Sequence, residues 1–233
     1  MHSFRDQFTA LIIGASGGIG QAVCADLKKN PRCGAIVPLS RTSTPPLDLT
    51  NEASIGQAAA EVKKNHGSID LVFVASGILA PAGKGPEKTI RHIEQATMSQ
   101  VFAVNTIGPA LIARHFAPLL GRDSKSVLAF LSARVGSISD NQLGGWISYR
   151  ASKAALNQVV RTVSVEIARA RKQSVCLALH PGTVETNLSN DYSTDYEKFT
   201  PAQCAEKLLS VIENKKPPDS GGFFDYAGKA IEW

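Results

Sequence analysis

The stretch LIIGASGGIG, residues 11–20, decides how this chain is expected to fold. It places four glycines within seven residues, after an apolar run and before a segment of helical pattern, QAVCADLKK. Glycine weakens both strands and helices, so a cluster at their junction requires a reason. A strand, a glycine loop and a helix N-terminus form an anion site, because free N–H groups and the helix dipole attract phosphate. The stretch therefore predicts a strand–loop–helix unit whose backbone comes close to a phosphate-bearing ligand.

Apolar runs and segments of helical period continue to alternate along the rest of the chain. Strands are predicted at 9–15, 34–40, 69–76, 126–132 and 175–182. Helices are predicted from the glycine loop to about Lys29 and at 53–65, 97–120, 148–171 and 201–214, with a bend near Gly108 and Pro109 as an option. Strands that are apolar throughout are buried on both faces. The alternation therefore predicts one α/β domain over residues 1–233, a doubly wound parallel sheet flanked by helices on both faces.

Composition and charge disfavour several classes of protein. The chain has 233 residues, is 43% hydrophobic and carries a formal net charge of +5. Its basic residues come in separate pairs near predicted helix ends, where they suit the helix dipole, so nucleic acid is not an expected partner. No apolar run approaches the ~18 residues of a membrane helix, and the N-terminal stretch lacks an export signal. The four cysteines are scattered, which predicts reduced thiols, no metal site and a cytoplasmic location.

Three later features occur together with the glycine spacing Gly14-x-x-x-Gly18-x-Gly20. They are Asn105 in VNTIG, YRASK at 149–153 and HPGTVET at 180–186. In this order they resemble the short-chain dehydrogenase/reductase family, whose motifs are TGxxxGxG and YxxxK. The stretches LSARVGSISDNQLGGWISYRASKAALN and GGFFDYAGKAIEW are similar to its C-factor and sniffer-like carbonyl reductase branch.

The resemblance covers essentially the whole chain. It implies a Rossmann-type fold and hydride transfer between a nicotinamide cofactor and a small carbonyl or alcohol substrate. It also implies a homodimer or homotetramer built through the two long helices, 97–120 and 148–171.

The same resemblance implies a set of cofactor-binding residues. Gly14, Gly18 and Gly20 would hold the pyrophosphate, with Ser16 and Ile19 lining the turn. The further expected contacts are Ser40, Arg41, Asp48, Leu49, Ala75, Ser76, Gly77, Tyr149, Lys153, Pro181, Gly182, Val184 and Thr186. NAD enzymes carry an acidic residue at the end of the second strand, which here reads Leu39-Ser40-Arg41. An arginine suits a 2′-phosphate, so NADP(H) is favoured over NAD(H); the alternative is that Arg41 lies in solvent.

Tyr149 and Lys153 lie four residues apart, so they share one face of a helix. An ammonium near a phenol favours the phenolate, so the lysine is expected to lower the pKa of the tyrosine. Tyr149 would then exchange a proton with a carbonyl oxygen. In the family the matching lysine also holds the nicotinamide ribose, and Asn105 would hold a water connecting the lysine to solvent.

The family's substrate-binding serine is replaced here. Aligned on Gly136, its position is Ala133 in the run Leu131-Ser132-Ala133-Arg134. Ser132 is the favoured substitute, although successive strand residues point to opposite faces; Ser137 and Ser139 are the other candidates. The departure keeps a second function open, that of a nucleotide-binding signalling or scaffold protein with weak or vestigial catalysis.

The substrate side of the crevice has fewer signals. Residues 187–200 are polar and are expected to form a mobile lid over the substrate, with Leu143 and Trp146 as apolar wall. His180 is expected to be a packing residue rather than an acid or base.

Overall fold

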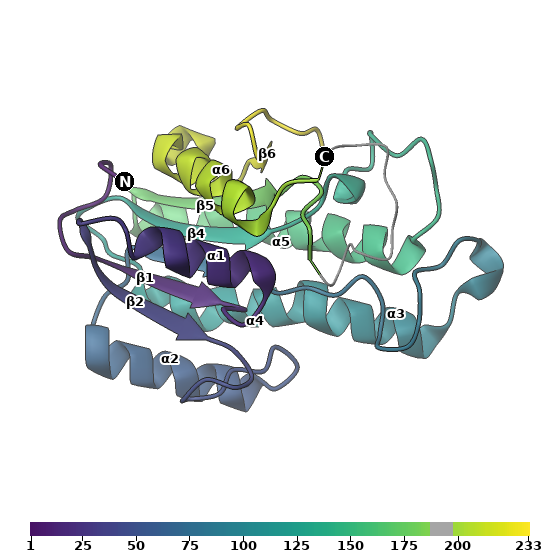
Figure 1. Ribbon diagram of the computed structural model, residues 1–233, viewed down its shortest axis with the longest axis horizontal. Coiled ribbons are helices and arrows are strands. Elements are labelled where there is room, and N and C mark those ends of the chain that lie inside the picture. Colours follow the sequence, from purple (N-terminus) through teal and green to yellow (C-terminus); the bar gives the residue numbers. More distant parts are fainter. Residues whose placement is uncertain (187–197) are drawn as a thin grey trace.

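The apolar runs form a six-stranded parallel sheet, seen in a computed structural model that describes residues 1–186 and 198–233 (Figure 1). The strand order is β2-β1-β3-β4-β5-β6. The strands are β1 (Phe8–Ile13), β2 (Cys33–Leu39), β3 (Leu71–Val74), β4 (Ser126–Leu131), β5 (Ser174–His180) and β6 (Phe223–Asp225). The helices are α1 (Gly18–Leu27), α2 (Glu52–His66), α3 (Gln95–Phe102), α4 (Gly108–Phe116), α5 (Ile147–Ala170) and α6 (Pro201–Asn214).

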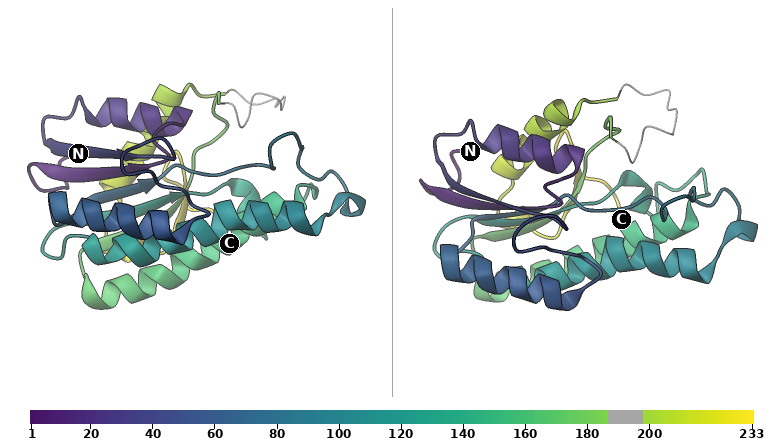
Figure 2. Two further views of the ribbon diagram at one scale, coloured as in Figure 1. Left: turned by 90° about the horizontal axis from the view of Figure 1, so that it is seen from below. Right: turned by 60° about the horizontal axis from the view of Figure 1, so that its bottom comes forward.

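Helices cover both faces of the sheet. Figure 2 shows α1 and α6 on one face and α2, α4 and α5 on the other. Every residue of β1, β3 and β4 is therefore buried, as the uniformly apolar runs predict. The chain leaves β1 toward β2 on one side and returns to β3 on the other, which makes the sheet doubly wound. The predicted α/β fold is confirmed.

The two edge strands differ from the prediction. β2 lies at one edge and is only partly buried, and its Pro38 is exposed, which suits an edge because proline offers no N–H. β6 was not predicted, because three residues in a Gly/Pro-rich tail give no strand pattern. It forms the other edge, where Phe224 pairs in antiparallel fashion with Ala230.

The long helix predicted at 97–120 is interrupted. A π-helical turn, Ala103–Ile107, separates α3 from α4, so the irregularity begins before Pro109, which lies in the first turn of α4. Among the described residues, Gln95–Leu119 is the one helical stretch that could cross a membrane by length and composition alone. It packs against α2 and α5, as core helices of this composition do.

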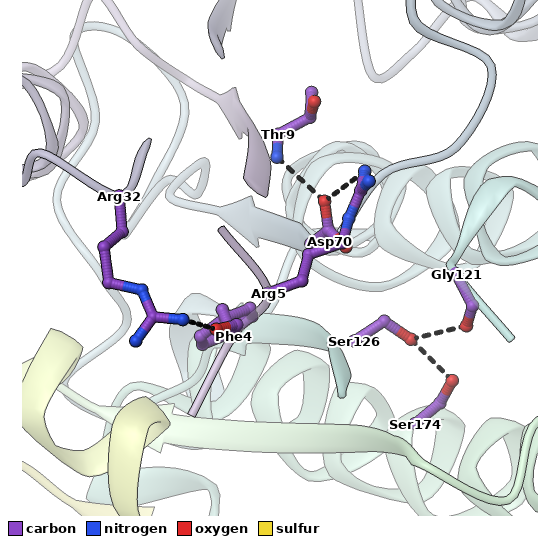
Figure 3. A network of polar contacts seen from close by, with 8 residues as sticks. All are labelled: Phe4, Arg5, Thr9, Arg32, Asp70, Gly121, Ser126 and Ser174. Atoms are coloured by element: carbon purple, nitrogen blue, oxygen red, sulfur yellow. Dashed lines mark hydrogen bonds and ion pairs between the residues drawn. The ribbon is translucent and has the colours of Figure 1, made fainter. Parts of the chain in front are cut away.

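Polar contacts hold the end of the sheet at which the strands begin (Figure 3). The buried Asp70 carboxylate accepts hydrogen bonds from Arg5 Nε (2.7 Å), Arg5 Nη2 (3.0 Å) and the Thr9 N–H (2.8 Å). The Ser126 and Ser174 hydroxyls bond to one another at 2.7 Å at the starts of β4 and β5. The opposite end, where the strands finish, carries the glycine loop and the other predicted site segments.

Candidate active site

The glycine loop joins β1 to α1 by a turn that excludes side chains. Gly14 has φ +83°, and a Cβ there would lie 2.6 Å from Ser76 Oγ. A Cβ at Gly20 would lie 2.3 Å from the Gly14 carbonyl oxygen. No described side chain caps the N-terminus of α1, where Gly17 and Gly18 are exposed. This cradle fits a diphosphate, because the first-turn N–H groups can donate to its oxygens.

The end of β2 carries one cation and one carboxylate. Arg41 is exposed immediately after the strand. Hydrogen bonds from the Thr50 N–H and hydroxyl lower the pKa of the Asp48 carboxyl, burial opposes them, and the charge of Arg41 lowers it further. Ser40 lies in the same turn, and Leu49 is buried against Gly108 at the start of α4. Arg41 and Asp48 therefore lie together at the mouth of the glycine crevice.

The end of β3 links the glycine loop to α5. The Ala75 N–H donates to the Ile13 carbonyl at 2.8 Å, and Ser76 touches the position a Gly14 side chain would take. A Cβ on Gly77 would lie 3.3 Å from Asn105 Oδ1 and 3.4 Å from Lys153 Nζ. The residues predicted for the pyrophosphate and for the chemistry thus lie next to one another at the end of β3.

Tyr149 and Lys153 are both buried on one face of α5. Lys153 Nζ lies 5.8 Å from the centre of the Tyr149 ring and donates to the Leu131 carbonyl at 2.9 Å. Burial raises the pKa of Tyr149 to about 12 and lowers the pKa of Lys153 to about 8. The pKa of Tyr149 therefore shifts in the direction opposite to the one expected from the lysine's charge, and the cause is loss of solvation by burial. At pH 7 the phenol is protonated and most of the amine is charged.

Asn105 lies in the π-helical turn and is fully buried. Its Oδ1 accepts from the Ile78 N–H at 2.9 Å, and its Nδ2 donates to the Ile78 carbonyl at 2.8 Å and to Ser152 Oγ at 3.1 Å. These bonds tie the segment after β3 to α5 beside Lys153. The water-holding role of Asn105 remains a prediction.

The candidate serines are engaged elsewhere in the fold. Ser132 is buried and its Oγ donates to Asn157 Oδ1 at 2.6 Å, one turn beyond Lys153 on α5. Ser137 Oγ accepts from the Asp140 N–H, and Ser139 Oγ donates to the Trp233 carbonyl at 2.9 Å. Ala133 is only partly buried at the end of β4. Ser132 as the carbonyl-binding donor therefore remains a prediction that requires a change of partner.

The segment after β5 reaches back over the glycine loop. Gly182 has φ +77°, and a Cβ there would lie 2.9 Å from the Phe199 and Tyr226 rings. Val184 is buried in the core, and the Thr186 methyl lies 3.2 Å from the position of a Gly18 Cβ. Thr186 thus lies against the glycine loop, whereas Gly182 packs against Phe199 and Tyr226. The predicted lid falls mainly on residues 187–197, outside the described residues.

His180 and the apolar loop residues complete this side of the crevice. Burial and the nearby charge of Arg134 lower the pKa of His180 to about 4, against the opposing charge of Asp225, so the ring is neutral at pH 7. Trp146 lies edge-on to Tyr149, with ring centres 6.3 Å apart, whereas Leu143 is 92% exposed.

Two residues of this region have no motif that could have indicated them. Glu87 is buried and accepts from the Ser148 hydroxyl and N–H at the start of α5, although 61 residues separate the two in the chain. Arg134 bonds to Asp225, 91 residues later. Only the tertiary fold brings these partners together.

Comparison with known protein families gives a match over residues 14–212, to the family model described as enoyl-(acyl carrier protein) reductase. The 1-hydroxy-2-glutathionyl-2-methyl-3-butene dehydrogenase of Rhodococcus sp. is 30% identical over 97% of this chain and 99% of its own length. The C-signal of Myxococcus xanthus is 31% identical over 72% of this chain and 94% of its own length.

Two solved structures are similar over nearly the whole fold. The NADPH-bound carbonyl reductase from chicken fatty liver has a TM-score of 0.86 at 28% identity, covering 100% of this chain and 97% of that one. The carbonyl reductase Sniffer of Drosophila melanogaster, at 21% identity, shares the fold with a TM-score of 0.84 over 98% of this chain and 100% of that one.

Proposed function

Because the chain belongs to the short-chain dehydrogenase/reductase family and is a dehydrogenase/reductase enzyme, we propose that it reduces a small carbonyl compound with NADPH. The proposal is carried by one observation: Tyr149 and Lys153 lie buried on one helix face, beside Gly77 and the crevice of the glycine loop. A proton donor and a fixed cation at the end of a doubly wound sheet suit chemistry on a bound dinucleotide.

The protonation states of this pair favour reduction. The raised pKa of Tyr149, about 12, keeps the phenol protonated, so it can donate its proton to the carbonyl oxygen. A nicotinamide cofactor held at the glycine loop would supply the hydride for the carbonyl carbon. Lys153 stays largely charged at pH 7, and its ammonium stabilises the negative charge that develops on the phenol oxygen as the proton leaves. The Leu131 carbonyl, which accepts a hydrogen bond from Nζ at 2.9 Å, fixes the position of this amine.

NADP(H) is preferred to NAD(H) in this proposal. Residues 39–41 contain no carboxylate that would repel a 2′-phosphate, and Arg41 is exposed where a guanidinium could bind one. Asp48 neutralises part of this charge, and Thr50 holds its carboxylate in place. The NADPH in the chicken reductase supports the same preference.

The test is turnover by the purified protein. We expect NADPH oxidation with a panel of aldehydes, ketones and quinones, a weaker rate with NADH, and a loss of about 10²–10⁴-fold for Tyr149→Phe, which removes the proton donor. The variant keeps its ring packing, so unchanged NADPH binding by fluorescence is the control. Turnover that survives in Tyr149→Phe would contradict the assignment.

A second candidate function is nucleotide-binding signalling with weak or vestigial catalysis. It is supported by Ala133, which stands at the position of the family's substrate-binding serine, and by the similarity to the C-signal. A nucleotide-binding signalling protein would bind NADPH and reduce none of the panel. If Ala133→Ser then raises a slow rate by about 10²-fold, the missing hydroxyl was the limit and the enzyme assignment stands.

A further inference from the structure

Arg134 occupies an unusual place at the mouth of the crevice. It follows Ala133 directly after β4, and its side chain is 44% exposed. Its Nη2 donates to Asp225 Oδ2 at 3.3 Å, at the end of β6. Since β5 lies between these two strands and His180 pairs in register with Asp225, the guanidinium crosses above the end of β5. The backbone that carries Arg134 lies against α5, because a Cβ at Gly136 would lie 2.8 Å from the Lys153 Cβ.

The ion pair with Asp225 holds the Arg134 side chain in place but uses only one of its guanidinium nitrogens. Asp225 is itself held, because its Oδ1 accepts from the Ala227 N–H at 2.9 Å and the Lys229 N–H at 3.0 Å. Across the described chain, Nη2 is the one guanidinium nitrogen of Arg134 with a hydrogen-bond acceptor. Nε and Nη1 remain available to a ligand, and the neighbouring His180 ring is uncharged at pH 7.

We propose that Arg134 binds an anionic group of the substrate, so that the preferred substrates are carbonyl compounds that also carry a carboxylate. A guanidinium presents parallel N–H groups that match the two oxygens of a carboxylate. Leu131 and Gly136, on either side of Arg134 in the chain, both contact Lys153, so Arg134 is attached close to the proposed catalytic pair. This inference rests on the proposed reductase function and names its substrate class.

The test compares two aldehydes that differ in charge and by one methyl group, 4-carboxybenzaldehyde and methyl 4-formylbenzoate, each with saturating NADPH. We expect the wild type to prefer the acid in kcat/KM. Arg134→Met should raise KM for the acid by ~10–100-fold, since a charge-assisted hydrogen-bond pair is lost, and leave the ester within about twofold. The KM of Arg134→Lys for the acid should lie between the values of the wild type and of Arg134→Met. Arg169→Met, an exposed arginine near the far end of α5, is the matched control and should change neither substrate.

Equal losses on both aldehydes in Arg134→Met would overturn the proposal, because Arg134 would then serve the carbonyl oxygen or the fold. Unchanged kinetics on both would also overturn it. If the wild type reduces neither aldehyde, the reductase proposal fails on this pair, and calorimetry tests the subsite separately. Benzoate should then bind the NADP⁺-saturated wild type and lose affinity in Arg134→Met, whereas absence of binding to the wild type overturns the subsite.

Discussion

Lys153 is a buried amine whose function conflicts with its surroundings. The proposed chemistry needs the charged ammonium, but burial lowers the pKa of this group from 10.5 to about 8. A hydrogen bond to the Leu131 carbonyl offsets part of the lost solvation. Holding the charged form at pH 7 therefore costs folding free energy, which is typical of groups that serve a site rather than the fold.

We expect Lys153→Met to remove activity and to make the protein more stable at pH 7, by about 1–3 kcal/mol. A lysine with a lowered pKa in the folded state contributes full stability above pH 10.5, and this contribution is lost as the pH falls through about 8. The stability advantage of Lys153→Met over the wild type should therefore decrease between pH 8 and pH 10. Tyr149 does not disturb this window, because its raised pKa costs stability only as the pH rises from 10 toward 12. Thermal denaturation of both proteins at pH 7 and pH 10 measures the effect, and a methionine variant that is less stable at both values contradicts it.

The start of α5 is held by another element. Glu87, in the loop between β3 and α3, accepts from the Ser148 N–H at 3.3 Å and from its hydroxyl, while its backbone carbonyl accepts from the Trp146 N–H at 2.5 Å. A carboxylate at a helix N-terminus satisfies first-turn donors and suits the helix dipole. This contact lies one residue before Tyr149, so the loop positions the proposed proton donor.

Glu87→Ala should lower stability by about 1–3 kcal/mol, because buried donors at Ser148 lose their acceptor. It should also lower kcat more than it raises the KM for NADPH, since the glycine loop is untouched. Glu87→Gln keeps an acceptor oxygen and should recover most of kcat. Glu61→Ala, at a half-buried position of α2 away from this contact, is the control. Equal rates in the alanine variant and the wild type would refute the positioning role.

The sequence predicted the elements better than their contacts. For the strands that are buried on both faces, the predicted bounds lie within two residues of the observed ones. This accuracy follows because an uninterrupted apolar run directly indicates burial. The π-helical turn at Asn105 and the short β6 were missed, since both depend on tertiary neighbours rather than on local pattern. Of the candidate site, the motifs indicated the glycine loop and the Tyr149–Lys153 pair. They could not indicate Glu87 or Arg134, whose partners lie 61 and 91 residues away.

For the whole molecule we expect a homodimer or homotetramer formed through the outer faces of the two long helical stretches, 97–120 and 148–171. Each long helical stretch exposes a branched apolar side chain, Ile107 at 53% and Val165 at 47%. Val165→Glu would place a charge in such an interface and should reduce the molar mass measured by light scattering to that of one chain. Gln57→Glu, which adds a charge at an exposed position of α2, is the control and should leave the molar mass unchanged. A wild type that is already a single chain at micromolar concentration would refute the expected assembly.

The edges of the sheet have a consequence for aggregation. An unpaired strand invites another chain to extend the sheet into a filament. In this protein Pro38 deprives one border of an N–H donor. At the other border the tail turns back, and the Ile231 N–H donates to the Phe223 carbonyl while the Asp225 N–H donates to the Lys229 carbonyl. Among the described residues, the proline interrupts the row of free N–H groups on β2 and the tail covers part of β6, so concentrated solutions should resist fibril growth.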